Sequence, residues 1–126
     1  MPQLDTFPNP RPGRAFVIES VTHEFTCVCP NTGQPDFATL RIRYVPDASC
    51  VELKSLKLFL GGFRDEGHYH EDVTNRILDA LVEASAPTWM EVRGEFRTRG
   101  GIATTITARH GSRPHGVEDV ERAPFH

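Results

Sequence analysis

Residues 15–45, AFVIESVTHEFTCVCPNTGQPDFATLRIRYV, decide the fold, because two strand-like runs flank a short turn. The first run, Ala15 to Cys27, places β-branched and apolar residues on both faces, as a strand does. The second run, Phe37 to Val45, alternates between apolar residues and a side with Thr39, Arg41 and Arg43, so we predict a strand half exposed to solvent. The turn between them, residues 29–36, holds two prolines and a glycine. The whole stretch therefore predicts a β-hairpin.

Two helices are predicted after this hairpin, because the spacing of the apolar residues changes. Beyond a turn at residues 46–49, apolar residues recur every three or four positions until Gly61-Gly62, at Leu53, Leu56, Leu60 and Phe63. A second helix is predicted over residues 70–84, and Pro87 closes that segment. Its apolar stripe consists of Val73, Ile77, Leu78, Leu81 and Val82.

A second hairpin completes the predicted domain. Residues 88–98 and 102–110 have strand patterns, and Gly100-Gly101 supplies the turn between them. The order of elements predicts an α+β domain over residues 15–110, with a four-stranded antiparallel sheet and two helices on one face. Residues 1–14 contain four prolines and are predicted to form an arm without regular structure. Residues 111–126 are predicted to be a loosely ordered tail.

Composition narrows the classes of partner. A chain of 126 residues with 38% hydrophobic and 25% charged residues is typical of one soluble domain. Its net charge of -3 gives no basic footprint, so we expect no direct nucleic acid partner. No apolar run approaches the roughly 20 residues that span a bilayer, and the first residues lack the pattern of a signal peptide. We therefore expect no membrane partner, a cytoplasmic location and reduced thiols at Cys27, Cys29 and Cys50.

The first turn also carries a pair of residues suited to catalysis. Cys29 is a candidate nucleophile, and Asp36, on the other side of the turn, is a candidate proton donor. Together they predict covalent catalysis with assistance from a general acid. The alternative is that Cys29 is an inert small apolar residue and that Asp36 is an ordinary turn residue.

The chain contains four distinctive segments, CPNTGQPDFA, ELKSLKLFL, HYHED and RTRGGI. Together they resemble the QueF family, the nitrile reductases of queuosine biosynthesis, which is a tRNA modification pathway. The resemblance covers roughly residues 15–110. It implies the tunnelling fold (T-fold), whose members form oligomeric barrels. Single-module members assemble as pentameric rings that stack in pairs as decamers. A small sheet with two open edges has a physical reason to close against identical copies, so we expect a homo-oligomer.

The resemblance also implies a reaction. Cys29 matches the nucleophile that adds to the nitrile carbon of 7-cyano-7-deazaguanine and forms a thioimidate. Asp36 matches the residue that protonates the nitrile nitrogen. Two hydrides from NADPH then give 7-aminomethyl-7-deazaguanine, so the resemblance implies an oxidoreductase with a small-molecule substrate. A carboxyl group that donates a proton near neutral pH would need a raised pKa.

The remaining site residues follow from the same match. His70 and Glu71 match the substrate-binding pair, and Val51, Glu52 and Leu53 match residues that face the substrate. Residues matching the cofactor motifs are Lys54, Ser55, Lys57, Arg99 and Gly100. No metal is predicted. The alternatives are that Glu71 complements the helix dipole, that His70 caps the turn, and that the lysines form a solvated basic face.

Three other functions stay open at this point. A zinc-dependent hydrolase related to GTP cyclohydrolases would use Cys27, Cys29, His68 and His70 as ligands, but it leaves Asp36 and the two lysines without roles. A QueF-like tRNA amidinotransferase would share Cys29 and Asp36 but use ammonia, and the intact ELKSLKLFL segment argues against it. A purine-binding module without catalysis would make Cys29 purely structural.

Overall fold

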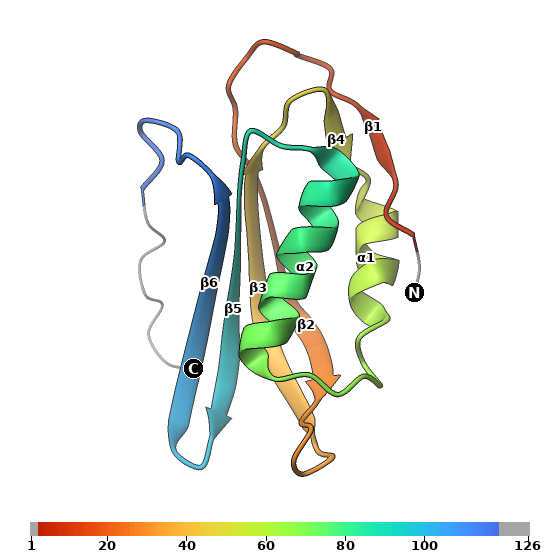
Figure 1. Ribbon diagram of the computed structural model, residues 1–126, viewed down its shortest axis with the longest axis vertical. Coiled ribbons are helices and arrows are strands. Elements are labelled where there is room, and N and C mark those ends of the chain that lie inside the picture. Colours follow the sequence, from red (N-terminus) through yellow and green to blue (C-terminus); the bar gives the residue numbers. More distant parts are fainter. Residues whose placement is uncertain (1–2, 119–126) are drawn as a thin grey trace.

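A computed structural model describes residues 3–118 and contains the predicted four-stranded antiparallel sheet. Its strands are β2 (Ile18–Val28), β3 (Pro35–Val45), β5 (Trp89–Arg99) and β6 (Ile102–Gly111), in the order β2-β3-β5-β6. The helices α1 (Leu53–Gly61) and α2 (His70–Ser85) both lie on one face of this sheet (Figure 1). The predicted α+β architecture is therefore confirmed. No helix of the described residues is long and apolar enough to cross a membrane.

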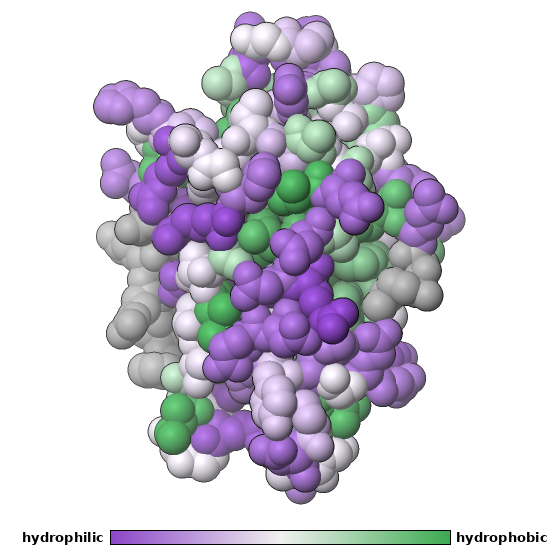
Figure 2. Space-filling model, viewed as in Figure 1, coloured by the Kyte–Doolittle hydropathy of each residue, from purple (hydrophilic) through white to green (hydrophobic). Residues whose placement is uncertain are grey.

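The core forms between the helices and one face of the sheet. Alternation along β3 turns Leu40 and Ile42 toward α2, which contributes Val73, Ile77 and Leu81, and all five are almost completely buried. Full burial of each such side chain stabilises the fold by about 1.5–3 kcal/mol relative to exposure. The outward surface of α2 is polar, and Figure 2 shows hydrophilic side chains over it. The helix therefore has the amphipathic pattern that the sequence predicts.

The ends of the helices follow from local chemistry. Glu52 caps α1, because its carboxylate accepts hydrogen bonds from the backbone N–H groups of Lys54 and Ser55, both at 2.8 Å. The second helix, α2, has its C-cap at Ala86, which takes a left-handed conformation with φ of 46° and is followed by Pro87. The helix boundaries lie within about two residues of the predicted ones, the usual uncertainty at helix ends.

The prediction that residues 1–14 lack regular structure is wrong for part of the arm. Strand β1 (Thr6–Pro8) pairs antiparallel with β4 (Ser49–Val51), part of which falls in the predicted turn, and the two form a separate two-stranded sheet. Asn9 extends this contact, because its side chain donates to the Asp47 carbonyl at 2.8 Å. Proline is tolerated in this strand because the N–H groups on the open side of an edge strand have no partner strand to donate to.

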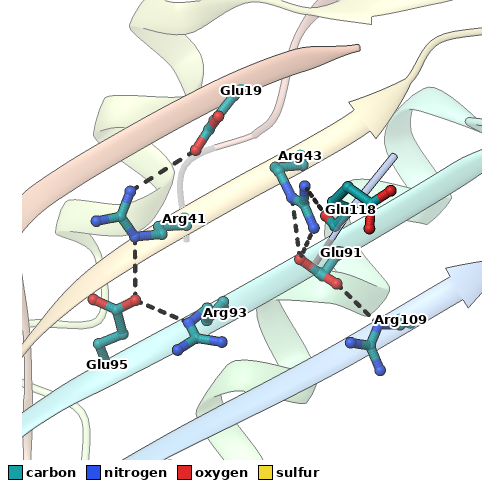
Figure 3. Close-up of polar contacts among 8 residues, drawn as sticks. All are labelled: Glu19, Arg41, Arg43, Glu91, Arg93, Glu95, Arg109 and Glu118. Carbon is teal, nitrogen blue, oxygen red and sulfur yellow. Dashed lines mark hydrogen bonds and ion pairs between the residues drawn. The ribbon is translucent and has the colours of Figure 1, made fainter. Parts of the chain in front are cut away.

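The prediction that β3 is half exposed on its polar side is also wrong. Arg43 is buried there and donates two hydrogen bonds to Glu91 of β5, at 3.1 and 2.8 Å. Arg41 donates one hydrogen bond to Glu95 at 3.1 Å, and Figure 3 shows how these pairs cross the strands on the face opposite the helices. Arg43 also donates to the backbone carbonyl of Glu118 at 2.9 Å, so the tail reaches this face. Residues 119–126 of the predicted loose tail lie outside the described residues.

Candidate active site

The turn that carries Cys29 is closed by its own backbone. The Cys29 N–H donates to the Gln34 carbonyl at 2.8 Å, and the Gly33 N–H donates to the Cys29 carbonyl at 2.9 Å. Gly33 has a φ of 72°, a conformation that favours glycine because it has no Cβ. This turn leaves Cys29 half buried just beyond the end of β2, whereas Cys27, two residues earlier, is completely buried.

The two thiols differ in their electrostatics. The Thr32 hydroxyl and the backbone N–H groups of Thr32 and Asn31 lower the pKa of Cys29, against the opposing effects of partial burial and of Asp36. Burial raises the pKa of Cys27 to about 11, with added repulsion from Asp36 and Cys29. Only the thiolate is a good nucleophile, so Cys29 is the reactive thiol of the pair.

A second set of contacts fastens this turn to the connection between α1 and α2. The Val28 N–H donates to the Glu66 carbonyl at 2.9 Å, and the His68 N–H donates to the Val28 carbonyl at 3.1 Å. Next along the chain, the Tyr69 hydroxyl donates to the Asn31 side chain at 3.0 Å. These bonds bring the start of α2, and with it His70, to the turn.

Asp36 lies in β3, opposite Cys27 on β2, and it is only 5% exposed. Its Oδ1 accepts a hydrogen bond from Arg99 Nη1 at 2.6 Å, and its Oδ2 lies 3.2 Å from His70 Nε2. The Asp36 carboxylate thus accepts a hydrogen bond from Arg99 at one oxygen and has the His70 ring beside the other. The structure brings together four of the residues predicted for the site: Cys29, Asp36, His70 and Arg99.

The imidazole of His70 is held in place by a flat aromatic contact. Its ring stacks on Phe96 of β5, with the ring centroids 3.8 Å apart and the planes inclined by 7°. The N-cap of α2 is Tyr69, and His70 is the first residue inside the helix, so the capping alternative is wrong. Glu71 follows in the first turn of α2 with an exposed side chain, and Gly100 follows Arg99 in the hairpin turn with a φ of 58°.

The residues predicted from the ELKSLKLFL segment lie elsewhere on the chain. Two grooves, of about 460 and 440 Å³, run between β2 and α1. Lys57 lines the first, and Val51, Glu52 and Leu53 line the second, but Cys29 lines neither. Lys54 is exposed near the start of α1. One chain therefore carries two separate groups of predicted site residues.

Ser55 differs from its neighbours in this segment. Its side chain is buried, its hydroxyl accepts from the Asp5 N–H at 2.9 Å, and it donates to the Glu52 carbonyl at 2.8 Å. The hydroxyl therefore accepts one bond from the arm and gives its proton to the helix cap. The assignment of Ser55 to the cofactor has no geometric support in the chain.

Four residues of the site were missed in the sequence: Thr32, Gln34, Tyr69 and Phe96. The first two lie inside the CPNTGQPDFA segment, where the tendency of a threonine to bond nearby backbone was an available signal. Gln34 accepts from Arg99 Nη2 at 3.2 Å. Phe96 is separated from His70 by 26 positions, so its role depends on the packing of α2 against β5, which no local pattern reveals.

The ligands proposed for a zinc site are already committed to other contacts. The ring nitrogens of His68 lie 2.8 Å from Glu66 and 3.3 Å from Asp72. His70 faces Asp36 and Phe96, and Cys27 is a fully buried residue of β2 that belongs to the hydrophobic core. Among residues 3–118, no three histidine, cysteine or acidic side chains are grouped as metal ligands.

Comparison with known proteins gives a consistent result. A family model described as QueF-like protein matches residues 35–115. The chain is 68% identical to the NADPH-dependent 7-cyano-7-deazaguanine reductase of Anaeromyxobacter dehalogenans (strain 2CP-C), over 90% of this chain and 93% of the relative. It is 62% identical to the protein of the same name from Thiobacillus denitrificans, over 85% and 77% of the two chains.

A solved structure supports the fold independently. The crystal structure of the archaeosine synthase QueF-Like in the apo form superposes with a TM-score of 0.72 at 19% identity. It covers 78% of this chain and 96% of that one. At this identity the match concerns the fold alone.

Proposed function

This chain belongs to the QueF-like protein family, and we propose that it is an NADPH-dependent 7-cyano-7-deazaguanine reductase. It reduces the nitrile of its substrate to an aminomethyl group in queuosine biosynthesis. The names of its relatives favour this function over the zinc hydrolase and the amidinotransferase. A pathway of tRNA modification implies a cytoplasmic location.

One observation carries the proposal: a thiol with a lowered pKa lies near a buried carboxyl group that contacts Arg99 at one oxygen and His70 at the other. The Cys29 thiolate attacks the nitrile carbon, and the negative charge gathers on nitrogen. Asp36, which lies across from Cys27 on the same strand pair, transfers a proton to that nitrogen, and the thioimidate results. His70 fixes one oxygen of Asp36 and offers its ring, already flat against Phe96, as a wall for a planar base.

Recognition of the substrate falls to Glu71 in the first turn of α2. A carboxylate accepts two N–H bonds side by side, which matches the amide and amino edge of a guanine-like base. The exposed position of Glu71 leaves both oxygens accessible, while the adjacent His70 borders the same space.

Each NADPH, when bound, would supply one hydride, so one nitrile needs two. Besides the proton that forms the thioimidate, one further proton goes to the substrate nitrogen with the second hydride. The chain offers suitable groups for the phosphates of NADPH in Lys54 and Lys57 on the exposed side of α1 and in Arg99. An added Cβ at Gly100 would meet no atom within 4 Å, so a cofactor can approach the backbone there. After the first reduction Cys29 would leave as the thiolate, and the imine that remains must be shielded from water.

The two separate groups of site residues favour assembly with identical copies. Strands β2 and β6 form the edges of the four-stranded sheet, and Val17, Val21 and Ile102 are exposed near them. Pairing β2 of one copy with β6 of the next would satisfy both edges and bring the β2–α1 grooves beside a neighbouring site. The expected product is a pentameric ring or a stacked decamer, which light scattering on a sizing column measures directly.

The test of the activity follows NADPH absorbance at 340 nm with 7-cyano-7-deazaguanine, run to exhaustion. We expect two NADPH consumed per nitrile by the natural chain and none by Cys29→Ala. The matched control is Cys27→Ala, which removes the neighbouring thiol and should keep the stoichiometry. If the natural chain consumes no NADPH but incorporates ammonia, the reductase assignment is wrong.

A further inference from the structure

The connection between α1 and α2 leads into a cluster of titratable side chains that has no role in the proposed reaction so far. The ring of His68 lies between two carboxylates: its Nε2 is 2.8 Å from Glu66 Oε1, and its Nδ1 is 3.3 Å from Asp72 Oδ2. The same ring meets the buried Phe63 edge-on, with the ring centroids 5.7 Å apart. We call Glu66, His68 and Asp72 the clasp. With only 12% of its side chain exposed, His68 is held from three sides.

One end of the clasp is joined to the Cys29 turn through the backbone. The Val28 N–H donates to the Glu66 carbonyl at 2.9 Å, and the His68 N–H donates to the Val28 carbonyl at 3.1 Å. Val28 and Gly67 thereby form a parallel bridge. Because Val28 directly precedes Cys29, the place of the reactive sulfur follows the place of residues 66–68.

The other end of the clasp belongs to α2. Asp72 lies in the first turn of this helix, directly after Glu71. The hydrogen bond from Arg76 lowers the pKa of Asp72 most, and His68 lowers it further, so Asp72 is a carboxylate that accepts from the ring. His68 therefore connects the segment bound to the Cys29 turn with the helix start that presents Glu71.

The reactivity of the thiol has a separate origin. Backbone bonds within residues 29–34 close the turn, and the Thr32 hydroxyl and the N–H groups of Thr32 and Asn31 lower the pKa of Cys29. None of these groups belongs to the clasp. A bond from the Tyr69 hydroxyl to Asn31 also ties the turn to the start of α2, but it lies at the surface, with Tyr69 55% exposed. The clasp is thus the more buried of these two ties, and it affects where an activated thiol lies.

We propose that the clasp positions the nucleophile, in that His68 fixes the Cys29 sulfur at the distance from Glu71 that brings it onto the nitrile carbon of a bound base. This inference rests on the proposed function, which assigns the base to Glu71 and the nitrile to Cys29. A base held at one edge by α2 has its nitrile carbon at one fixed place, and a misplacement of about 1 Å between reacting groups can lower a rate about 100-fold. His68 acts through Cys29 in this role and is a positioning residue.

The competing explanation is that the clasp only stabilises the fold, as exposed ion pairs do to a small extent. Addition of the thiol to the nitrile separates the two explanations, because the thioimidate forms before any hydride is needed. The full chain is mixed rapidly with saturating 7-cyano-7-deazaguanine without NADPH. Absorbance follows the rate of adduct formation, and mass spectrometry identifies the adduct on Cys29. Two further measurements are the binding of the product, 7-aminomethyl-7-deazaguanine, by calorimetry and the alkylation of Cys29 by iodoacetamide.

We expect His68→Ala to form the adduct about 10-fold to 100-fold more slowly, because the sulfur and the nitrile are no longer aligned. Product binding and alkylation should stay nearly unchanged, because Glu71 still binds the base and a small untethered reagent needs no alignment. The matched control is Arg76→Ala, which removes the other partner of the same Asp72 oxygen and should keep the natural rate of adduct formation.

A second variant tests whether the clasp acts as one unit. Asp72→Ala should also slow adduct formation, and the double variant should be no slower than His68→Ala alone, because the two side chains share one contact. If His68→Ala does not fold, Asp72→Ala replaces it, since Asp72 is exposed. Independent, additive slowing by the two substitutions would contradict a shared positioning role.

An unchanged rate of adduct formation in His68→Ala would overturn the positioning role and leave the reductase assignment intact. Equal slowing of adduct formation and alkylation would overturn it as well, because His68 would then act on the reactivity of the thiol itself. Equal slowing in Arg76→Ala would assign the effect to the surface of α2 and contradict the role of His68. Failure of the natural chain to form any adduct would overturn the proposed function, and the positioning role with it.

Discussion

Two carboxylates of this molecule are buried to a similar degree and bound by arginine, yet their surroundings differ. Glu91 is 2% exposed and binds Arg43 and Arg109 on the open face of the sheet (Figure 3). Asp36 is 5% exposed and binds Arg99 and His70 at the end of the same sheet, beside the Cys29 turn. Glu91 and its arginines join the middles of neighbouring strands. Asp36 and its partners join β3, the start of α2 and the end of β5.

This contrast suggests what separates an ion pair that only stabilises the fold from one that takes part in the reaction. The Arg43 side chain is 9% exposed and lies over Trp89, with its guanidinium carbon 5.4 Å from the ring centroid, so the pair has little freedom to exchange partners. Arg99 is four times as exposed and borders a turn of two glycines with positive φ. Burial of the carboxylate is common to both, so the accessibility of the arginine is the property that differs.

The largest effect expected from this contrast concerns activity. Asp36→Asn keeps the shape of the side chain but cannot donate a carboxyl proton, and loss of a general acid typically lowers a rate about 100-fold to 10,000-fold. We expect kcat for nitrile reduction to fall by that amount while the unfolding midpoint in urea changes little. Glu91→Gln is the matched control and should keep kcat within a few-fold when corrected for folded protein. A large loss of kcat in Glu91→Gln would end the distinction between the two carboxylates.

The second prediction reverses the comparison and concerns stability. In Glu91→Gln the buried Arg43 loses its counter-charge, and breaking a buried pair in this way costs about 3–5 kcal/mol. We expect a lower free energy of unfolding by roughly that amount, measured by urea denaturation with the slope of the transition unchanged. Arg76→Ala removes an exposed ion pair with Asp72 and should leave the urea midpoint nearly unchanged. Equal effects of the two variants would mean that burial does not govern these pairs.

The same contrast explains which parts of the fold the sequence could predict. Alternation along residues 37–45 and the helical period of α2 are local patterns, and both elements appear where they were expected. The burial of Arg43 could not be predicted, because its partner Glu91 lies 48 positions away. Strand β1 was missed for a similar reason, since three residues with a proline become a strand only when β4 lies beside them.

The site residues also divide into those that a local pattern predicts and those that depend on distant partners. Cys29 and Asp36 lie on either side of one short turn, and their types alone suggested a nucleophile with an acid. That Arg99 would contact Asp36, 63 positions away, required the register of β3 with β5. The resemblance assigned Arg99 to the cofactor, and the structure adds a second partner that a match of motifs does not contain. Chemistry within a turn was therefore predictable, and coupling between distant segments was not.

The smallest predicted effect concerns the two thiols, which repeat the contrast on a finer scale. The pKa of Cys29 is lowered by the Thr32 hydroxyl and by nearby N–H groups, while that of Cys27 is raised by burial to about 11. Iodoacetamide reacts with the thiolate, so modification of Cys29 should rise with pH through a midpoint below the ordinary thiol value. Cys27 should stay unmodified in the folded protein at neutral pH, as read by mass spectrometry of the peptides.

Replacing the hydroxyl isolates its contribution. Thr32→Val keeps the shape of the side chain and both backbone N–H groups but removes the leading cause of the lowered pKa, so the alkylation midpoint of Cys29 should move to higher pH. At a fixed pH below the midpoint the thiolate fraction, and with it the alkylation rate, should decrease. Thr26→Val is the matched control, because its hydroxyl donates to the Asp36 carbonyl at 2.8 Å on the far side of the strand pair and should not shift the midpoint. If Thr32→Val leaves the Cys29 midpoint in place, the turn activates its thiol through the backbone alone, and the side chains of this turn serve the fold rather than the chemistry.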